Sequence, residues 1–269
     1  MNPALDARCV RWRRGEPSAS TRALADEVAV AISHNRETHA VMMATPADIV
    51  DFATGFSLTE GVIDDAGQIE EIEVVEVEDG IEARMWLAPE QVARAQVRRR
   101  RLAGPTGCGL CGIDSLAEAV RPPRPINGTL RVTPAMVAEA QAAMDAALPL
   151  GARTRAVHAA ALWHPAHGLL AAREDVGRHN ALDKLVGAAA LGGFPSDECV
   201  LLLSSRVSIE MVQKACVLGS PVLVAISAPT AHAVRLAEQA GLTLVAVARA
   251  DGFEVFAGHH RVTEPAYVA

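Results

Sequence analysis

Two patterns of hydrophobic residues divide the chain. In the first half, apolar and polar residues alternate, as in EVAVAISHNRETHAVMMATP from Glu27 and EIEVVEVEDGIEARMWLA from Glu71. Strict alternation is typical of strands with one buried face, and turn residues stand at 34–36 and at Asp79-Gly80. The first half is therefore predicted to contain two β-hairpins.

In the second half the apolar runs are uninterrupted. ECVLLLSS, PVLVAIS and LTLVAVA are separated by helical sequences that end in glycine, and the β segments AVHAAALWHP and GLLAARE precede them. Such runs indicate strands that are buried on both faces. Their alternation with helices predicts an α/β fold with a mostly parallel sheet flanked by helices.

Capping residues and breakers give the predicted boundaries. Thr45-Pro46 and Thr133-Pro134 each supply an N-cap and a first-turn proline, and Gly61 ends the first of these helices. Two more helices are predicted in PEQVARAQVRRRRL and IDSLAEAV, and the Pro-rich stretch 121–130 is the best linker candidate. We therefore predict an irregular N-terminal arm at 1–26, a smaller α+β part at 27–125 with a cysteine loop at 104–113, and an α/β cofactor-binding domain at 126–269.

Composition narrows the classes of function. The 269 residues are 50% hydrophobic and carry a formal net charge of -7, which suits a globular core and argues against a chain-wide nucleic-acid surface. No apolar run approaches the ~18 to 20 residues of a membrane span, and the first residues lack the apolar segment of a signal peptide. We expect a cytoplasmic protein that binds neither nucleic acid nor a membrane.

Polar residues follow each predicted strand of the second half. In an open α/β sheet, ligands bind beyond the carboxyl ends of the strands, where helix N-termini offer free N–H groups. Each of these turns alone could hold ordinary N-caps and solvated arginines, but together they favour an anionic, nucleotide-like ligand. The residues concerned are Asp175, Gly177, Arg178, His179, Asn180, Ser204, Ser205, Arg206, Pro229, Thr230, Arg249, Ala250, Asp251 and Gly252.

The stretch GPTGCGLCGIDSL places two cysteines two residues apart, at Cys108 and Cys111. Five cysteines make an odd count, which indicates free thiols. A structural zinc site needs four ligands, and the only plausible second pair, His164 and His167, is spaced more tightly than the usual His pair of such sites, so zinc stays a weakly supported alternative. A redox dithiol usually caps its helix directly, whereas residues 112–114 intervene here. The glycines favour a mobile thiol that takes a group from one partner and delivers it to another.

Several motifs together resemble one family. They are GFSLTEGVI, GCGLCG, REDVGRHNALDKLVG, LLLSSRVSIEMVQKA and ISAPTAHAVRLAEQAG. From about residue 27 to about residue 258 the chain resembles the FdhD family, sulfur carrier proteins required for formate dehydrogenase activity. The resemblance implies a homodimeric sulfurtransferase with a fold like that of cytidine deaminase, without the zinc.

The resemblance also implies specific roles. Cys108 would accept sulfur from a cysteine desulfurase as a persulfide, and Cys111 is the second cysteine of the motif. The sulfur would pass to the molybdenum cofactor, a bis(molybdopterin guanine dinucleotide), before its insertion into formate dehydrogenase, and GDP would mimic part of that cofactor. The cofactor-binding segment of the family falls on Val247, Ala248, Arg249, Ala250, Asp251 and Gly252.

We therefore hypothesise that Cys108 carries sulfur, that Cys111 assists its release, and that the strand-end residues hold the cofactor, with no resident metal. The alternative is a non-catalytic chaperone of the molybdenum cofactor in which the two cysteines bind zinc or form a redox latch. Stoichiometric zinc in the purified protein would favour this alternative. His158, in a predicted strand, is expected to be a core histidine.

Overall fold

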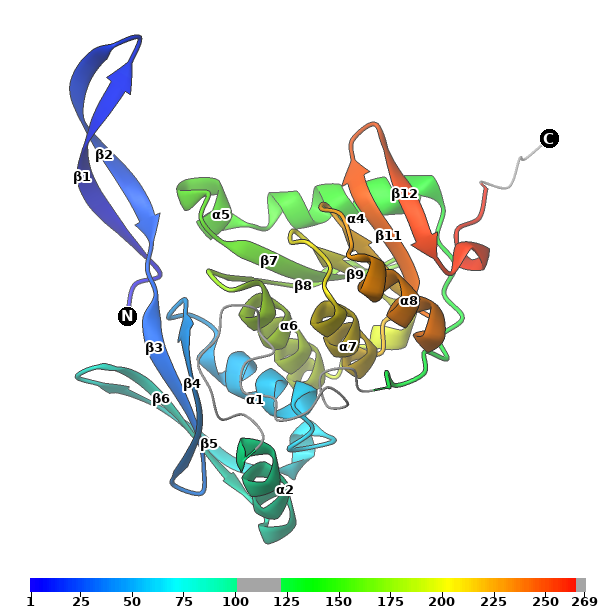
Figure 1. Ribbon diagram of the computed structural model, residues 1–269, viewed down its shortest axis with the longest axis horizontal. Helices are drawn as coiled ribbons and strands as arrows, with labels where there is room; N and C mark the ends of the chain where they lie inside the picture. The colour runs from blue at the N-terminus through cyan, green and yellow to red at the C-terminus, as the bar shows by residue number, and fades with distance from the viewer. Residues whose placement is uncertain (101–121, 265–269) are drawn as a thin grey trace.

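The computed structural model describes residues 1–100 and 122–264, which form three sheets and their covering helices (Figure 1). Cys108, Cys111 and the short helix predicted in IDSLAEAV lie outside the described residues. Within them, no helix is long and apolar enough to cross a membrane.

The N-terminal residues form a β-ribbon and not the predicted irregular arm. Strands β1 (Ala4–Arg13) and β2 (Glu16–Ala25) pair antiparallel along their whole length. The turn between them places Arg14 and Gly15 at φ of 52° and 88°. The prediction was wrong because the ribbon has no buried apolar face to produce alternation: within it only Ala4 is buried.

The two hairpins predicted in the first half are present. They are β3 (Val28–His34) with β4 (Glu37–Ala44), and β5 (Ile69–Val77) with β6 (Gly80–Leu87). Parallel pairing of β3 with β6 joins them into a four-stranded sheet of order β4-β3-β6-β5. Helix α2 (Pro89–Arg100) follows β6, and the short turn η1 (Ala66–Gln68) precedes β5.

Helix α1 (Ile49–Thr59) lies between this sheet and the rest of the protein (Figure 1). Its N-cap is Asp48, with a left-handed φ of 55°, so the prediction that Thr45 caps this helix was wrong. One side of α1 packs on β3 and β6 through Phe52 and Phe56. The other side packs on α6, so nearly every residue of α1 is buried.

The second half forms a six-stranded sheet of order β12-β11-β10-β9-β7-β8. Only the β9–β10 and β10–β11 pairs are parallel, so the prediction of a mostly parallel sheet was wrong. Connections of a few residues lead from β7 to β8 and from β11 to β12, and such short connections force antiparallel pairing. The strands are β7 (His158–His164), β8 (Gly168–Asp175), β9 (Val200–Leu203), β10 (Val222–Ala225), β11 (Thr243–Arg249) and β12 (Gly252–Ala257).

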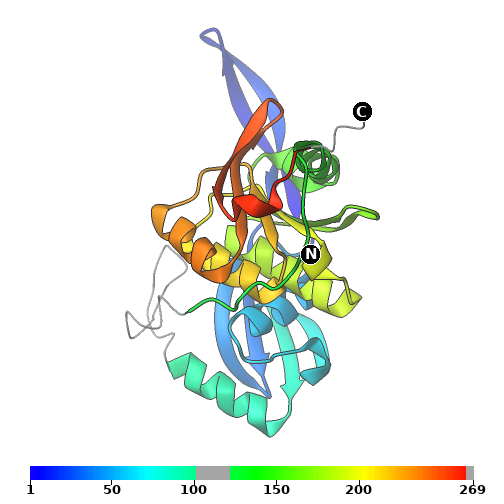
Figure 2. The ribbon, with the colours of Figure 1, turned by 90° about the vertical axis from the view of Figure 1, so that its right-hand side faces the viewer.

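Helices cover both faces of this sheet (Figure 2). One face holds α6 (Arg178–Gly192), α7 (Ile209–Leu218) and α8 (Ala231–Ala240), and the other holds α4 (Pro134–Ala146). Thr133 caps α4 as predicted, since its hydroxyl accepts from the N–H of Met136. The remaining elements are α5 (Pro149–Thr154), η2 (Ser196–Glu198) and η3 (His259–Arg261).

Two glycines allow α1 and α6 to cross in direct backbone contact. A Cβ atom on Gly55 of α1 would lie 1.7 Å from the carbonyl oxygen of Asp183, and one on Gly187 of α6 would lie 1.9 Å from that of Asp51. Hydrophobic residues from α1, α6, α7 and the six-stranded sheet then share one core. The N-terminal part is thus packed tightly against the helices of the second half.

We predict that Gly187→Ala lowers the free energy of unfolding by about 1 to 3 kcal/mol, because the added methyl group has no space at the crossing. Gly192→Ala, in the same helix, is the control: its Cβ meets only the ring of Phe194, which can move. Chemical denaturation of both variants measures the effect. Equal stability of the two variants would contradict a tight crossing.

Candidate functional site

Four strands point their carboxyl ends to the same edge of the six-stranded sheet. β8 is antiparallel to β7, which is antiparallel to β9, so β8 runs in the direction of β9, β10 and β11. All the strand-end segments predicted to hold a ligand therefore follow strands that end at this edge, hereafter the carboxyl edge.

Hydrogen bonds join these segments. The Oγ of Ser204 accepts from the N–H of Ala159 at 2.7 Å, and β7 thereby connects the end of β9 with the end of β8. The N–H of Thr230 donates to the carbonyl of Val207 at 2.9 Å, and the guanidinium of Arg249 donates to the carbonyl of Ile226. The structure therefore brings the predicted segments into one continuous rim.

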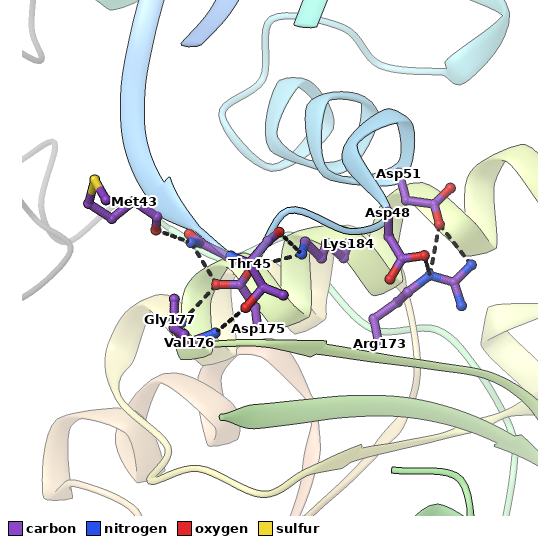
Figure 3. Close-up of polar contacts among 10 residues, drawn as sticks. Met43, Thr45, Asp48, Asp51, Arg173, Asp175, Val176, Gly177 and Lys184 are labelled. Atoms are coloured by element: carbon purple, nitrogen blue, oxygen red, sulfur yellow. Dashed lines mark hydrogen bonds and ion pairs between the residues drawn. The ribbon is translucent and has the colours of Figure 1, made fainter. Parts of the chain in front are cut away.

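The carboxylate of Asp175 makes structural contacts at one end of this rim (Figure 3). Its Oδ2 lies 2.7 Å from Nζ of Lys184, and both side chains are fully buried. The same carboxylate accepts from the N–H of Thr45 at 3.0 Å, from the N–H of Gly177 at 2.8 Å and from Nδ2 of Asn180 at 2.9 Å. Because these contacts occupy its oxygens, Asp175 positions other groups and does not face a ligand.

Two partners of Asp175, Lys184 and Asn180 on α6, also bond the corner between β4 and α1. The ammonium of Lys184 also donates to the carbonyl of Thr45 at 2.9 Å, and Thr45 Oγ1 accepts from the N–H of Val176 at 3.1 Å. The side chain of Asn180 donates to the carbonyl of Met43 at 2.9 Å. Figure 3 shows this corner seated on the first turn of α6.

An ion pair at one end of α1 and a hydrogen-bonded ion pair at the other end fasten it to its neighbours. Arg173 on β8 lies 2.7 Å from Asp51 in the first turn of α1 (Figure 3). At the other end of α1, the hydroxyl of Thr59 donates to Asp183 at 2.7 Å, and Lys214 on α7 lies 2.7 Å from the same carboxylate. Burial raises the pKa of Asp183, and the Lys214 ammonium opposes that rise. On the polar face of α6, the side chains of Asp183 and Lys184 are therefore occupied by contacts within the protein.

Other groups on the rim remain available to a ligand. Among the described residues, the buried Nε of Arg178 and Oγ of Ser208 have no hydrogen-bond partner. Arg178 begins α6, and Ser208 is the N-cap of α7 without a capping bond from its side chain. A buried donor without a partner is costly, and both groups lie at helix N-termini, where anions bind.

A histidine–carboxylate pair lies beside them. Nε2 of His179 is 2.6 Å from Oε2 of Glu210, so it joins the first turns of α6 and α7. The half-buried His158 has a lowered pKa, because of its burial and then the charges of Arg178 and His179. His158, predicted to be an ordinary core residue, thus lies near the rim and favours its neutral form.

The predicted cofactor segment 247–252 contains an unusual backbone conformation. Val247 has a φ of 51°, and the β11–β12 register shifts between Ala246 and Arg249. A β-branched residue in the left-handed region is rare, and such conformations gather at functional sites. Ala248 is buried, and Ala250 and Asp251 are exposed at the turn into β12.

Three rim residues were missed from the sequence. Ser208 and Glu210 follow a loop after β9, beyond the strand end itself, although extending the sheet-edge rule to the next helix N-cap would have found them. His158 starts β7, and its place at the rim depends on the β7–β8 pairing, which the sequence did not specify. Of the predicted residues, Ser205 is buried and Arg206 is exposed.

No cluster of three or more metal-ligating side chains is found in residues 1–100 and 122–264. His164 and His167 are stacked, with ring centroids 4.5 Å apart, and His164 lies 3.4 Å from Glu198. The zinc alternative concerns Cys108 and Cys111, which lie outside the described residues.

A sequence model of the FdhD/NarQ family matches residues 25–263. The chain belongs to the FdhD/NarQ family. It is 48% identical over 251 residues to a sulfur carrier protein FdhD from Agrobacterium fabrum, with 93% of each chain covered. It is 50% identical to the protein of that name from Brucella abortus, with 91% of each chain covered.

A solved structure shares the fold of this FdhD/NarQ family member. It is the crystal structure of a protein provisionally described as a formate dehydrogenase accessory protein from Desulfotalea psychrophila. The TM-score is 0.78, with 97% of this chain and 100% of the other covered at 24% identity. The mixed α/β architecture is therefore found in a solved structure, whereas the likeness to cytidine deaminase stays a prediction.

In this FdhD/NarQ family member we predict that Lys184→Met lowers the free energy of unfolding by about 3 to 5 kcal/mol, because it leaves Asp175 buried without its counter-charge. The control is Arg94→Met, which breaks the exposed pair of Arg94 with Asp64. Water screens that pair, so its loss has a much smaller effect. Denaturant unfolding of both variants tests this, and a Lys184→Met protein as stable as the control would contradict the structural role of the pair.

Proposed function

We propose that this protein is a sulfur carrier that serves formate dehydrogenase. It accepts sulfur from a cysteine desulfurase on Cys108 and passes it to the molybdenum cofactor, bis(molybdopterin guanine dinucleotide), before that cofactor enters formate dehydrogenase. The observation that carries the proposal is the 48% identity, across 93% of the chain, to a protein named as a sulfur carrier, together with the thiol pair Cys108 and Cys111.

The first step is a thiol–persulfide exchange. The Cys108 thiolate attacks the outer sulfur of the persulfide on the desulfurase, the sulfur–sulfur bond there breaks, and the desulfurase cysteine leaves as a thiolate. Cys108 then carries the additional sulfur as its own persulfide. No electrons are gained or lost overall, so loading needs no oxidant.

Cys111 provides a route for release. Its thiolate attacks the inner sulfur of the Cys108 persulfide, which forms a Cys108–Cys111 disulfide and expels the outer sulfur as hydrosulfide. The two thiols are oxidised and the transferred sulfur is reduced. A cellular dithiol must then reduce the disulfide before the next cycle.

The remaining cysteines have poor chemistry for this role. Cys199 and Cys216 are buried, and burial raises the pKa of each thiol to about 12. At neutral pH they are almost entirely protonated, and a thiol is far less nucleophilic than a thiolate. Cys9 is exposed on the ribbon and serves as an internal control for non-specific loading.

The carboxyl edge fits the acceptor. A guanine dinucleotide carries pyrophosphates, and the unsatisfied donors of Arg178 and Ser208, at the N-termini of α6 and α7, suit phosphate oxygens. Thr230 caps α8 at the same rim, and the segment 247–252 forms the end of β11 and the turn into β12. We propose that these residues hold the cofactor together with Gly177, His179, Ser204, Ser205, Arg206 and Pro229, and that Asp175 and Asn180 position the first turn of α6.

The chain that follows the cysteine motif is anchored at the opposite edge of the sheet. The N–H of Ile126 donates to the carbonyl of Ala240, at the end of α8, and Arg261 donates to the carbonyls of Gly128 and Gly241. These residues surround the amino end of β11.

The partners of the proposed function are a cysteine desulfurase, formate dehydrogenase and a second copy of the chain. The last of these, a homodimer, follows from the family resemblance. The action takes place in the cytoplasm, where the thiols stay reduced.

We predict that incubation with a cysteine desulfurase and L-cysteine adds one reducible sulfur atom to the wild type and to Cys9→Ala, but not to Cys108→Ala. Cys111→Ala should still load, because attack on the donor needs only Cys108, and it should keep the sulfur longer. Intact-protein mass spectrometry before and after dithiothreitol measures each adduct.

The result separates the two functions. Loading of Cys108→Ala as fully as the wild type would contradict the assignment of the acceptor. If the wild type takes up no sulfur from an active desulfurase and the purified protein contains stoichiometric zinc, the sulfur-carrier proposal is wrong and the cofactor-chaperone function is favoured.

A further inference from the structure

The β1–β2 ribbon exposes large apolar side chains far from any core. It projects away from the body of the protein (Figure 1). Trp12 is 67% exposed and Val10 is 64% exposed, whereas Trp163 is buried in the six-stranded sheet. An isolated two-stranded ribbon is marginally stable in water, and exposed tryptophan is typical of interaction surfaces.

The apolar residues lie together on one face of the ribbon. In the antiparallel register Val10 faces Ala19 and Trp12 faces Pro17. Cross-strand neighbours on one face have Cβ atoms about 5 Å apart. These four side chains therefore form a continuous apolar patch near the tip.

The ribbon is also strongly basic, and its outer strand is unpaired. Arg22 on β2 donates to the carbonyl of Thr154 at 3.3 Å, which places β2 toward α5. Among the described residues, β1 pairs only with β2. The arginines of the ribbon are Arg8, Arg11, Arg13, Arg14 and Arg22, against the carboxylates Asp6 and Glu16.

A second surface of the same chain has the complementary character. Strand β5 is an edge of the four-stranded sheet and exposes Val74 and Val77, at 40% and 43%. Its sequence, IEEIEVVEV, contains Glu70, Glu71, Glu73 and Glu76 and no basic residue. Charges on an edge strand prevent pairing with an identical strand, but they favour a basic one.

The two strands match in length but cannot meet within one chain. At about 3.3 Å per residue, β1 with 10 residues spans about 33 Å and β5 with 9 residues about 30 Å. Beside the base of the ribbon, the N-terminal amine lies 2.6 Å from Glu76 of β5. From there the ribbon extends away from the four-stranded sheet (Figure 1).

We propose that β1 of one copy docks along β5 of a second copy, and that the exchange is reciprocal, so two such contacts close a two-fold symmetric dimer. Each contact joins the arginines of the ribbon to the glutamates of β5 and covers Val10 and Trp12. The inference rests on the homodimer of the proposed function and names its surface.

Charge reversal tests the contact with two variants. Arg11→Glu with Arg13→Glu gives a copy whose ribbon and β5 are both acidic, and Glu70→Arg with Glu71→Arg gives a copy whose ribbon is basic and whose β5 begins with two basic residues. Neither Glu70 nor Glu71 forms an ion pair within the described residues. In each variant alone, like charges meet at the reversed positions, whereas in a mixed pair opposite charges meet there in both contacts.

By analytical ultracentrifugation we expect the wild type, and Arg235→Glu as the surface control, to sediment as dimers. Each charge-reversed double variant should dissociate at least tenfold more readily, and an equimolar mixture of the two should return to the dimer. Trp12→Ser alone should weaken the dimer at least tenfold through the apolar patch.

A monomeric wild type, double variants that dimerise as the wild type does, or a mixture that stays monomeric would each overturn the proposal. Recovery in the mixture also excludes misfolding as the cause of dissociation. Sulfur loading of the same proteins by mass spectrometry reports separately on the proposed function, so failure of the interface and failure of the carrier are distinguishable.

Discussion

The buried ion pair of Asp175 and Lys184 joins the N-terminal part of the protein to α6. Both side chains are fully buried, so each needs the other and the backbone groups of Thr45 to offset its desolvation. Those contacts fix the β4–α1 corner on the first turn of α6. The same turn begins with Arg178 and His179, so the orientation of the rim depends on this fully buried ion pair.

This arrangement explains why polar residues next to one another in sequence have different roles. Asp175 and Asn180 face the N-terminal part and have their hydrogen bonds satisfied internally. Arg178, between them, keeps a buried donor without a partner among the described residues. The helix turns neighbouring side chains toward different surroundings, so one motif supplies both a structural joint and donors for an anion.

Much of the strand and helix pattern could be predicted, because hairpin turns, caps and buried runs are local signals. The Asp79-Gly80 turn and the Thr133 cap are examples. The helix at Thr45 was misplaced because Thr45 bonds Val176, 131 residues away, instead of capping α1. Likewise, the polar face of α6 gave no sign that it meets α1, since that contact depends on Gly55 and Gly187 approaching across the fold.

The most direct test of the acceptor site is hydrogen–deuterium exchange with and without GDP, on the wild type and on Arg178→Gln. Bound nucleotide should slow exchange at the first turns of α6, α7 and α8 and at 247–252, leave Gly128 and Gly241 unchanged, and protect Arg178→Gln much less. Protection confined to the amino end of β11, or equal protection in the variant, would contradict an acceptor site at the carboxyl edge.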